Sequence, residues 1–378
     1  MRAVVLTFDC LPLALLGCYG NSAGQTPHFD HFSARSVVFD QHFTCSVSPD
    51  ALNRGWMSGC YPGFGRSETA VDPTIYFERL GQNSVATQLV CSQSVSPSSD
   101  EKSLFGKAVS VDCPADGLCN SEDILSAVKQ AAGDLKSDSR GSSLLWISLA
   151  GIHEESARID DSAALQIEKL DDRLGRIVHL IEEIFVDEKI LFITTAGRGC
   201  VLGENRFRTE SHFRLTEEVV HTPLLLSLRN CDAVSHDFPA SSRRSFLAQP
   251  IDLMPTLFDW FEVSQDKQLF EGQSLIPIIN GAVGTREYAV MENGPGESAL
   301  RTPDFFLVTK MASDQLESEQ NPPSLFIKPD DRWDVNDVSL QEPDVLDQLV
   351  QTLQEFRVAA GLDSPLIAPL LKSSQIKK

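Results

Sequence analysis

The stretch Ser48-Pro49-Asp50 is the first place in this chain where residue types and spacing could perform chemistry. A serine hydroxyl or an aspartate carboxylate can act as a nucleophile, and Arg54, four residues after Asp50, could hold an anionic substrate. The same residues also fit a structural role. Serine is a favourable N-cap, proline suits the first helical position, and an acid stabilises the first turn. We favour this helix start, with Asp50 and Arg54 as an ordinary pair one turn apart.

A basic patch is the second such place, and it stands out because the chain is strongly acidic. Its members could bind an anion together, although each of them alone is more often a surface residue. They are Arg206, Arg208, His212 and Arg214. Arg198, which follows a predicted strand, could add a fixed positive charge or could be a solvated loop arginine.

Composition excludes several classes of partner. The chain has 378 residues, 42% of them hydrophobic, and a formal net charge of −21, which argues against nucleic acid and anionic membranes. No apolar run reaches the roughly 20 residues that a membrane span needs, and no secretory signal precedes the first strand. The nine cysteines include no CxxC pair, so neither a disulfide framework nor a zinc ribbon is indicated. We expect a cytoplasmic protein.

Short apolar runs alternate with helical patterns, which is typical of an α/β sheet with crossover helices. The runs lack strict alternation and therefore predict strands that are buried on both faces. They cover residues 3–9, 36–43, 84–90, 143–151, 189–197 and 222–228. Helical spacing predicts helices over 167–184 and 251–261, and polar residues predict loops over 92–102 and 136–143.

The pattern changes after about residue 285. Short strands at 287–292, 305–311 and 324–328 alternate with Pro, Asp and Asn turns, and a final helix covers 343–356. These elements predict a smaller antiparallel sheet with one helix. The predicted fold is thus a large, mostly parallel sheet sandwiched by helices over 1–285, with a small α+β subdomain over 286–378.

Several pieces of the chain, in order, resemble the sulfatase family of the alkaline phosphatase superfamily. The resemblance runs from residue 3 to about residue 357. Its pieces are AVVLTFDCLPLALLGCYGNSAGQTPHFDHFSARSVVFDQHF, MSGCYPG, EKLDDRLGRIVHLIEE, HTPLLL, IDLMPTL, GQSLIP, RTPDFFLV and LFIKPDDRWDVND. It implies the fold just described and an enzyme that holds a divalent cation, such as calcium, at the carboxyl edge of its sheet. It also implies a cysteine matured to formylglycine as the nucleophile.

The positions that carry this chemistry are changed here. Where the family has two aspartates after the first strand, this chain has Asp9-Cys10, so Asp9 is the only retained metal-ligand position. A gapless count from Phe39 to Gly59 puts Pro49 at the nucleophile and Asn53 at the arginine that follows it. Proline has no nucleophilic atom. Formylglycine chemistry is therefore excluded at this position.

The remaining slots have changed as well. The segment that supplies lysine and histidine reads Cys91-Ser92-Gln93-Ser94, and Gly197 and Arg198 replace two further metal ligands. A guanidinium cannot coordinate a cation, but it could take the cation's place as a fixed positive charge. His212 falls near the slot of a lysine, and His153 falls where the family often has a substrate-facing histidine.

Three hypotheses follow. The first is a catalytically inactive homologue without a cofactor, which retains the fold for a binding or regulatory role. Its ligand would be a small anion or a sulfated or phosphorylated molecule. The second is a sulfuric or phosphoric ester hydrolase with a rewired site, in which Ser48 or Asp50 works with Arg54, Arg198 and His212. The third is a subunit that pairs with an active sulfatase-like enzyme.

Overall fold

The computed structural model describes most of the chain and both predicted sheets. The described residues are 1–22, 25–64, 72–95, 97–112, 121–152, 160–202, 215–229, 239, 241–264, 270–294, 296–310 and 322–361. Among these residues, no helix combines the length and the apolar character that crossing a membrane requires.

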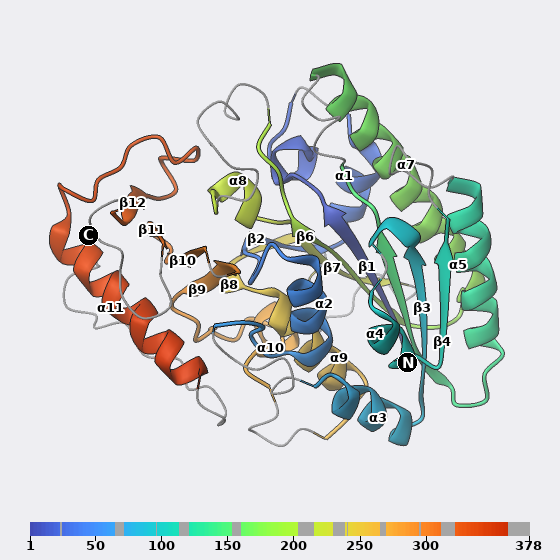
Figure 1. Cartoon of the computed structure of the whole chain (residues 1–378). Helices are drawn as coiled ribbons and strands as arrows, with labels where there is room; N and C mark the ends of the chain where they lie inside the picture. The colour runs from blue at the N-terminus through green and yellow to red at the C-terminus, as the bar shows by residue number, and fades with distance from the viewer. Residues whose placement is uncertain are drawn as a thin grey trace.

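An eight-stranded, mostly parallel sheet forms the centre of the molecule (Figure 1). Its strand order is β4-β3-β5-β1-β6-β7-β2-β8, and only β7 runs antiparallel to its neighbours. The strands are β1 (Arg2–Cys10), β2 (Val37–His42), β3 (Val85–Ser92), β4 (Lys107–Val111), β5 (Ser142–Leu149), β6 (Ile190–Arg198), β7 (Leu224–Arg229) and β8 (Ser242–Ala248). Six of them match the predicted apolar runs. Strands β4 and β8 were not predicted.

Helices cover both faces of this sheet, because each face presents a continuous apolar surface. One face packs against α1 (Pro27–Ser33), α5 (Ser121–Lys136) and α7 (Asp160–Ile184). The other packs against α2 (Pro49–Ser58), α3 (Thr74–Gln82), α9 (Leu253–Trp260) and α10 (Ile276–Ile279). The spacing that predicted the helix over 167–184 is confirmed. Its residues Ile167, Leu170, Leu174, Ile177 and Ile181 are all buried.

The second sheet has four antiparallel strands in the order β12-β11-β10-β9 (Figure 1). Its strands are β9 (Ala289–Asn293), β10 (Glu297–Arg301), β11 (Phe305–Lys310) and β12 (Ser324–Ile327). One face packs against α11 (Pro343–Ala360), and the other contacts segments of the large-sheet region. The predicted small sheet with one helix is confirmed, whereas the domain boundary at residue 285 stays a prediction.

The predicted loop over 92–102 is wrong in part. Residues there form a short 3-10 helix, Gln93–Val95, and α4, Ser99–Ser103. Ser98 and Glu101 make a reciprocal capping box, in which each side chain accepts a hydrogen bond from the other residue's backbone N–H. This local exchange satisfies the donors at the start of a helix in an otherwise polar segment.

Candidate functional site

Asp9 and Arg198 lie side by side at the carboxyl ends of two neighbouring parallel strands. Asp9 is the penultimate residue of β1, and Arg198 is the last residue of β6. Nη2 of Arg198 lies 3.7 Å from Oδ2 of Asp9, and the two side chains are 15% and 25% exposed. The pair therefore places a partly exposed guanidinium beside a carboxylate at the edge of the sheet.

Gly197, the residue before Arg198, packs closely against helix α2. A Cβ atom at Gly197 would lie 2.9 Å from Cδ1 of Leu52 and 3.0 Å from the carbonyl oxygen of Asp9. The Trp56 ring would be 3.3 Å away. This close approach packs the buried face of helix α2 against the strand end that carries Arg198.

Helix α2 begins at Pro49, as the sequence predicts, with Ser48 in the N-cap position. The Ser48 hydroxyl makes no capping hydrogen bond, so the expected capping by its side chain is wrong. Ser48, Pro49 and Asp50 are exposed, Asn53 is buried, and Arg54 is partly buried. The residue at the nucleophile position is thus an exposed proline in the first helical turn.

Cys45 does not replace the missing nucleophile. It is fully buried, and its Sγ would lie 3.0 Å from a Cβ atom at Gly55, inside the packing of α2. Burial raises the pKa of the Cys45 thiol to about 12. A buried thiol that stays protonated at neutral pH is a structural group rather than a nucleophile.

Glu101 interacts electrostatically with residues of α2 and was not singled out from the sequence. Its carboxylate accepts the Ser98 N–H at 3.0 Å and feels the charges of both Asp50 and Arg54. Burial raises the pKa of Glu101 above its usual value. The Ser-x-x-Glu capping pattern was the signal that could have revealed the helix carrying it.

The residues at the metal-ligand positions do not fit a divalent cation. A hard cation needs several oxygen ligands. Asp9 pairs with Arg198, and Gly197 has no ligand atom. The Cys10 thiol is hydrogen-bonded to Cys200 and fully buried, and both effects raise the pKa of Cys10 well above its usual range. Within the described residues, no three His, Cys, Asp or Glu side chains come together as a set of metal ligands.

The remaining predicted site residues are not placed by the structure. His153, His212 and the rest of the basic patch, Arg206, Arg208 and Arg214, lie outside the described residues. A hollow adjoins the end of β6, and its lining includes Cys200, Glu217, Glu218 and Trp333.

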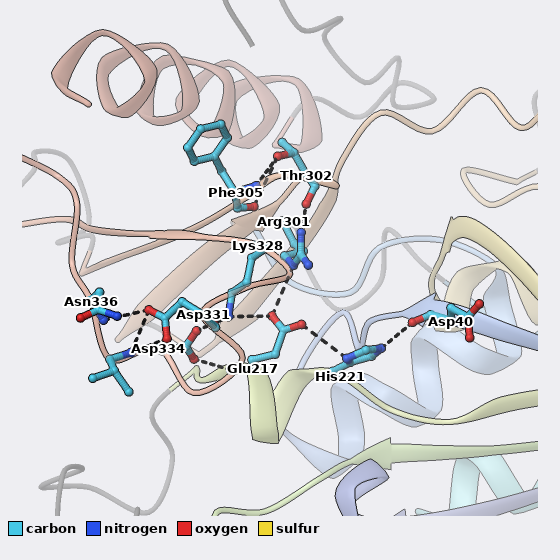
Figure 2. A network of polar contacts seen from close by, with 11 residues as sticks. Asp40, Glu217, His221, Arg301, Thr302, Phe305, Lys328, Asp331, Asp334 and Asn336 are labelled. Carbon is cyan, nitrogen blue, oxygen red and sulfur yellow. Dashed lines mark hydrogen bonds and ion pairs between the residues drawn. The ribbon is translucent and has the colours of Figure 1, made fainter. Parts of the chain in front are cut away.

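A network of polar contacts connects the two sheets beside this edge (Figure 2). Its centre is Glu217, the first residue of α8 (Glu217–Val220). Burial raises the pKa of Glu217, but Arg301, His221 and Lys328 outweigh that effect and hold it well below its usual range. This network was not predicted from the sequence, although His221, Arg301 and Lys328 belong to segments that carry the family resemblance.

Comparisons with known proteins agree with the architecture. A scan against protein-family models finds no match, and a search of curated proteins finds none either. Among solved structures, the putative sulfatase yidJ from Bacteroides fragilis superposes with a TM-score of 0.74 at 12% identity, covering 96% of each chain.

Two further structures contain sugars. A protein solved with its substrate D-glucosamine-2-N,6-O-disulfate has a TM-score of 0.72 at 14% identity, covering 96% of this chain and 98% of that one. The protein Ps i-CgsB, solved with a neocarrahexaose, has a TM-score of 0.71 at 15% identity, covering 97% and 94%. At these identities the similarity establishes the fold, and this chain has the sulfatase fold over nearly its whole length.

Proposed function

We propose that this chain is a catalytically inactive sulfatase-like protein that binds an anionic group at the carboxyl edge of its large sheet. The observation that carries the proposal is the Arg198–Asp9 ion pair. Arg198 stands at a family metal-ligand position, and its guanidinium contacts the one ligand that remains. A guanidinium presents a fork of N–H donors that matches the oxygens of a sulfate or a phosphate.

The proposed loss of chemistry has a physical basis in the residues at these positions. Cleavage of a sulfate or phosphate ester needs a nucleophile and enough positive charge to stabilise the leaving group. Pro49 supplies no nucleophilic atom, and the described residues at the metal positions do not form a cation site. One arginine can hold an anion without providing these two elements.

The ligand class follows from that charge. We propose a small anion, or a sulfated or phosphorylated molecule, as the ligand. The sugar complexes of two structures with the same fold, one of them with a disulfated glucosamine, make a sulfated sugar a reasonable probe. A subunit that pairs with an active sulfatase-like enzyme could also bind such an anion. Co-purification of that enzyme with this chain would distinguish the subunit from a protein that acts alone.

The first test is direct binding of inorganic sulfate and phosphate by isothermal titration calorimetry. Arg198→Met removes the charge and keeps much of the side chain's volume, so we expect anion affinity to fall roughly 10- to 100-fold. Arg140→Met is the matched control, because Arg140 pairs with Asp138 in a turn before β5, at the opposite end of the strands. Equal affinity in the wild type and Arg198→Met would contradict the proposal.

A second measurement addresses the rewired hydrolase. Purified protein is assayed with aryl sulfates and aryl phosphates, with and without added calcium, and we expect no turnover. Turnover that disappears in Ser48→Ala or Asp50→Ala would establish the hydrolase and refute the inactive homologue.

A further inference from the structure

Glu217 lies at the junction of the two sheets, with partners on both sides. Its Oε2 accepts from Nε of Arg301 in β10 at 3.3 Å and lies 3.5 Å from Nζ of Lys328, just after β12. Its Oε1 lies 3.4 Å from Nδ1 of His221, at the end of α8. The side chains of Glu217, Arg301 and Lys328 are all less than a tenth exposed. A buried carboxylate with two buried cations is a strongly directional anchor.

The backbone of Glu217 is held as well. Its N–H donates to Oδ2 of Asp334 at 2.7 Å, while Oδ1 of Asp334 accepts from Lys328 at 2.5 Å. Figure 2 shows this arrangement, in which the loop after β12 contacts the first turn of α8. The small sheet therefore fixes both the side chain and the backbone at the start of α8.

The other end of α8 contacts the strand end that carries Arg198. The N–H of Gly199 donates to the carbonyl oxygen of Val219 at 2.8 Å. A Cβ atom at Gly199 would lie only 2.1 Å from the carbonyl oxygen of Glu218. The residue directly after Arg198 is thus packed against α8 without space for a side chain.

The same helix also contacts the strand that leads to α2. Thr44 N–H donates to the carbonyl oxygen of Val220 at 2.9 Å, and Nε2 of His221 lies 2.8 Å from the carbonyl oxygen of Asp40. The His221 ring stacks on Phe43, with ring centroids 4.7 Å apart. The end of β6 and the approach to α2 are therefore both anchored on α8.

We infer that Glu217 is a positioning residue for the anion site: it locks α8 to the small sheet, and α8 in turn sets the place of Arg198 against Asp9 and α2. The inference rests on the proposed function for its binding readout. The carboxylate of Glu217 faces Arg301, Lys328 and His221 rather than Arg198. It acts through the Gly199 contact, so that loss of its charge loosens the strand end that presents the guanidinium.

A double-mutant cycle tests this coupling. Glu217→Gln removes the carboxylate charge that faces Arg301 and one of the two carboxylates that face Lys328, since Asp334 remains, and we expect sulfate affinity to fall about tenfold in calorimetry. In the Arg198→Met background, Glu217→Gln should change the remaining affinity by less than about twofold, because the residue through which it acts is gone. Glu217→Asp keeps the charge and should recover part of the affinity. Additive effects in the cycle would overturn the inference.

Glu188→Gln is the matched control. It removes the counter-charge of the buried Arg2, whose Nε lies 2.6 Å from Oε2 of Glu188 at the start of β1. We expect this variant to lose stability and to keep its sulfate affinity. An equal loss of affinity in Glu188→Gln would mean that general destabilisation, and not positioning, explains the result at Glu217.

A measurement without any anion separates this inference from the proposed function. Hydrogen exchange at the Gly199 amide should become faster in Glu217→Gln and stay unchanged in Glu188→Gln. Absence of sulfate binding in the wild type would refute the proposed function alone. Unchanged exchange at Gly199 in Glu217→Gln would refute the positioning role whatever the binding result.

Discussion

At the scale of single residues, the main finding is the ion pair between Arg198 and Asp9. The sequence indicated a guanidinium where the family has a metal ligand, but the contact with Asp9 depends on the register of β1 and β6, in which Cys10 aligns with Arg198. The ion pair balances the one carboxylate left at this edge. The charge of Asp9 is thus compensated from within the chain.

Asp334 gives a residue-scale prediction about pH. Burial raises the pKa of Asp334 to about 6, above that of an aspartate in an unfolded chain. The native state therefore binds a proton between about pH 4 and pH 6 that the unfolded state releases, so this group's contribution to stability is lost as pH rises through that range. Asp334→Asn should remove this component, on the order of 2–3 kcal/mol between pH 4 and pH 7.

The measurement for Asp334 is urea unfolding at several pH values. Glu217 acts in the opposite direction: its lowered pKa contributes stability above about pH 4.5 that is lost on further acidification. The comparison of Asp334→Asn with the wild type isolates the Asp334 component. Identical pH dependence in both proteins would contradict the prediction.

At the scale of elements, the segment in which the sequence predicted a helix start at Ser48 is a well-formed helix. Helix α2 starts with proline and ends at Ser58, and the φ of 68° at its C-cap residue Gly59 lies in the left-handed region that favours glycine. A Cβ atom there would lie 2.7 Å from Phe270 and 3.0 Å from Pro255. The start and the end of the helix are thus both specified by residues with fixed backbone preferences.

Gly59→Ala should therefore destabilise the protein by about 1–3 kcal/mol, because it adds backbone strain and a steric contact. Gly133 provides the opposite case within a helix. It lies in α5, and a Cβ atom at Gly133 would have no neighbouring atom within 4 Å, so Gly133→Ala should stabilise by up to about 1 kcal/mol. Thermal unfolding of both variants checks the two signs. Stabilisation by Gly59→Ala would contradict this account of the helix end.

The sequence predicted most elements because their apolar patterns are strong. It missed α5, in which alanines at 131 and 132 and a glycine at 133 weaken the contrast between the buried and the exposed face. It missed β8 because this edge strand carries Arg243 and Arg244. The network around Glu217 was out of reach for another reason: its partners in the small sheet lie about 80 or more positions away along the chain.

At the scale of the whole molecule, the small sheet packs against other parts of the chain on both faces. One face, together with α11, surrounds Tyr61 and Phe64 from the segment after α2, and the Tyr61 and Phe356 rings are 5.0 Å apart between centroids. The other face packs against Phe43 and Val219. The two sheets thus share apolar cores in addition to the Glu217 network.

This shared packing predicts that both sheets unfold in one transition. Leu349 on α11 is fully buried, so Leu349→Ala should cost about 2–5 kcal/mol and lower the stability of the entire chain. Val358 on the same helix is 69% exposed, and Val358→Ala should change stability by less than about 0.5 kcal/mol. Hydrogen exchange in increasing urea should show amides of β6 and β11 losing protection together. Loss of protection in β11 of Leu349→Ala while β6 remains protected would contradict a single transition and would make the small sheet an independent folding unit.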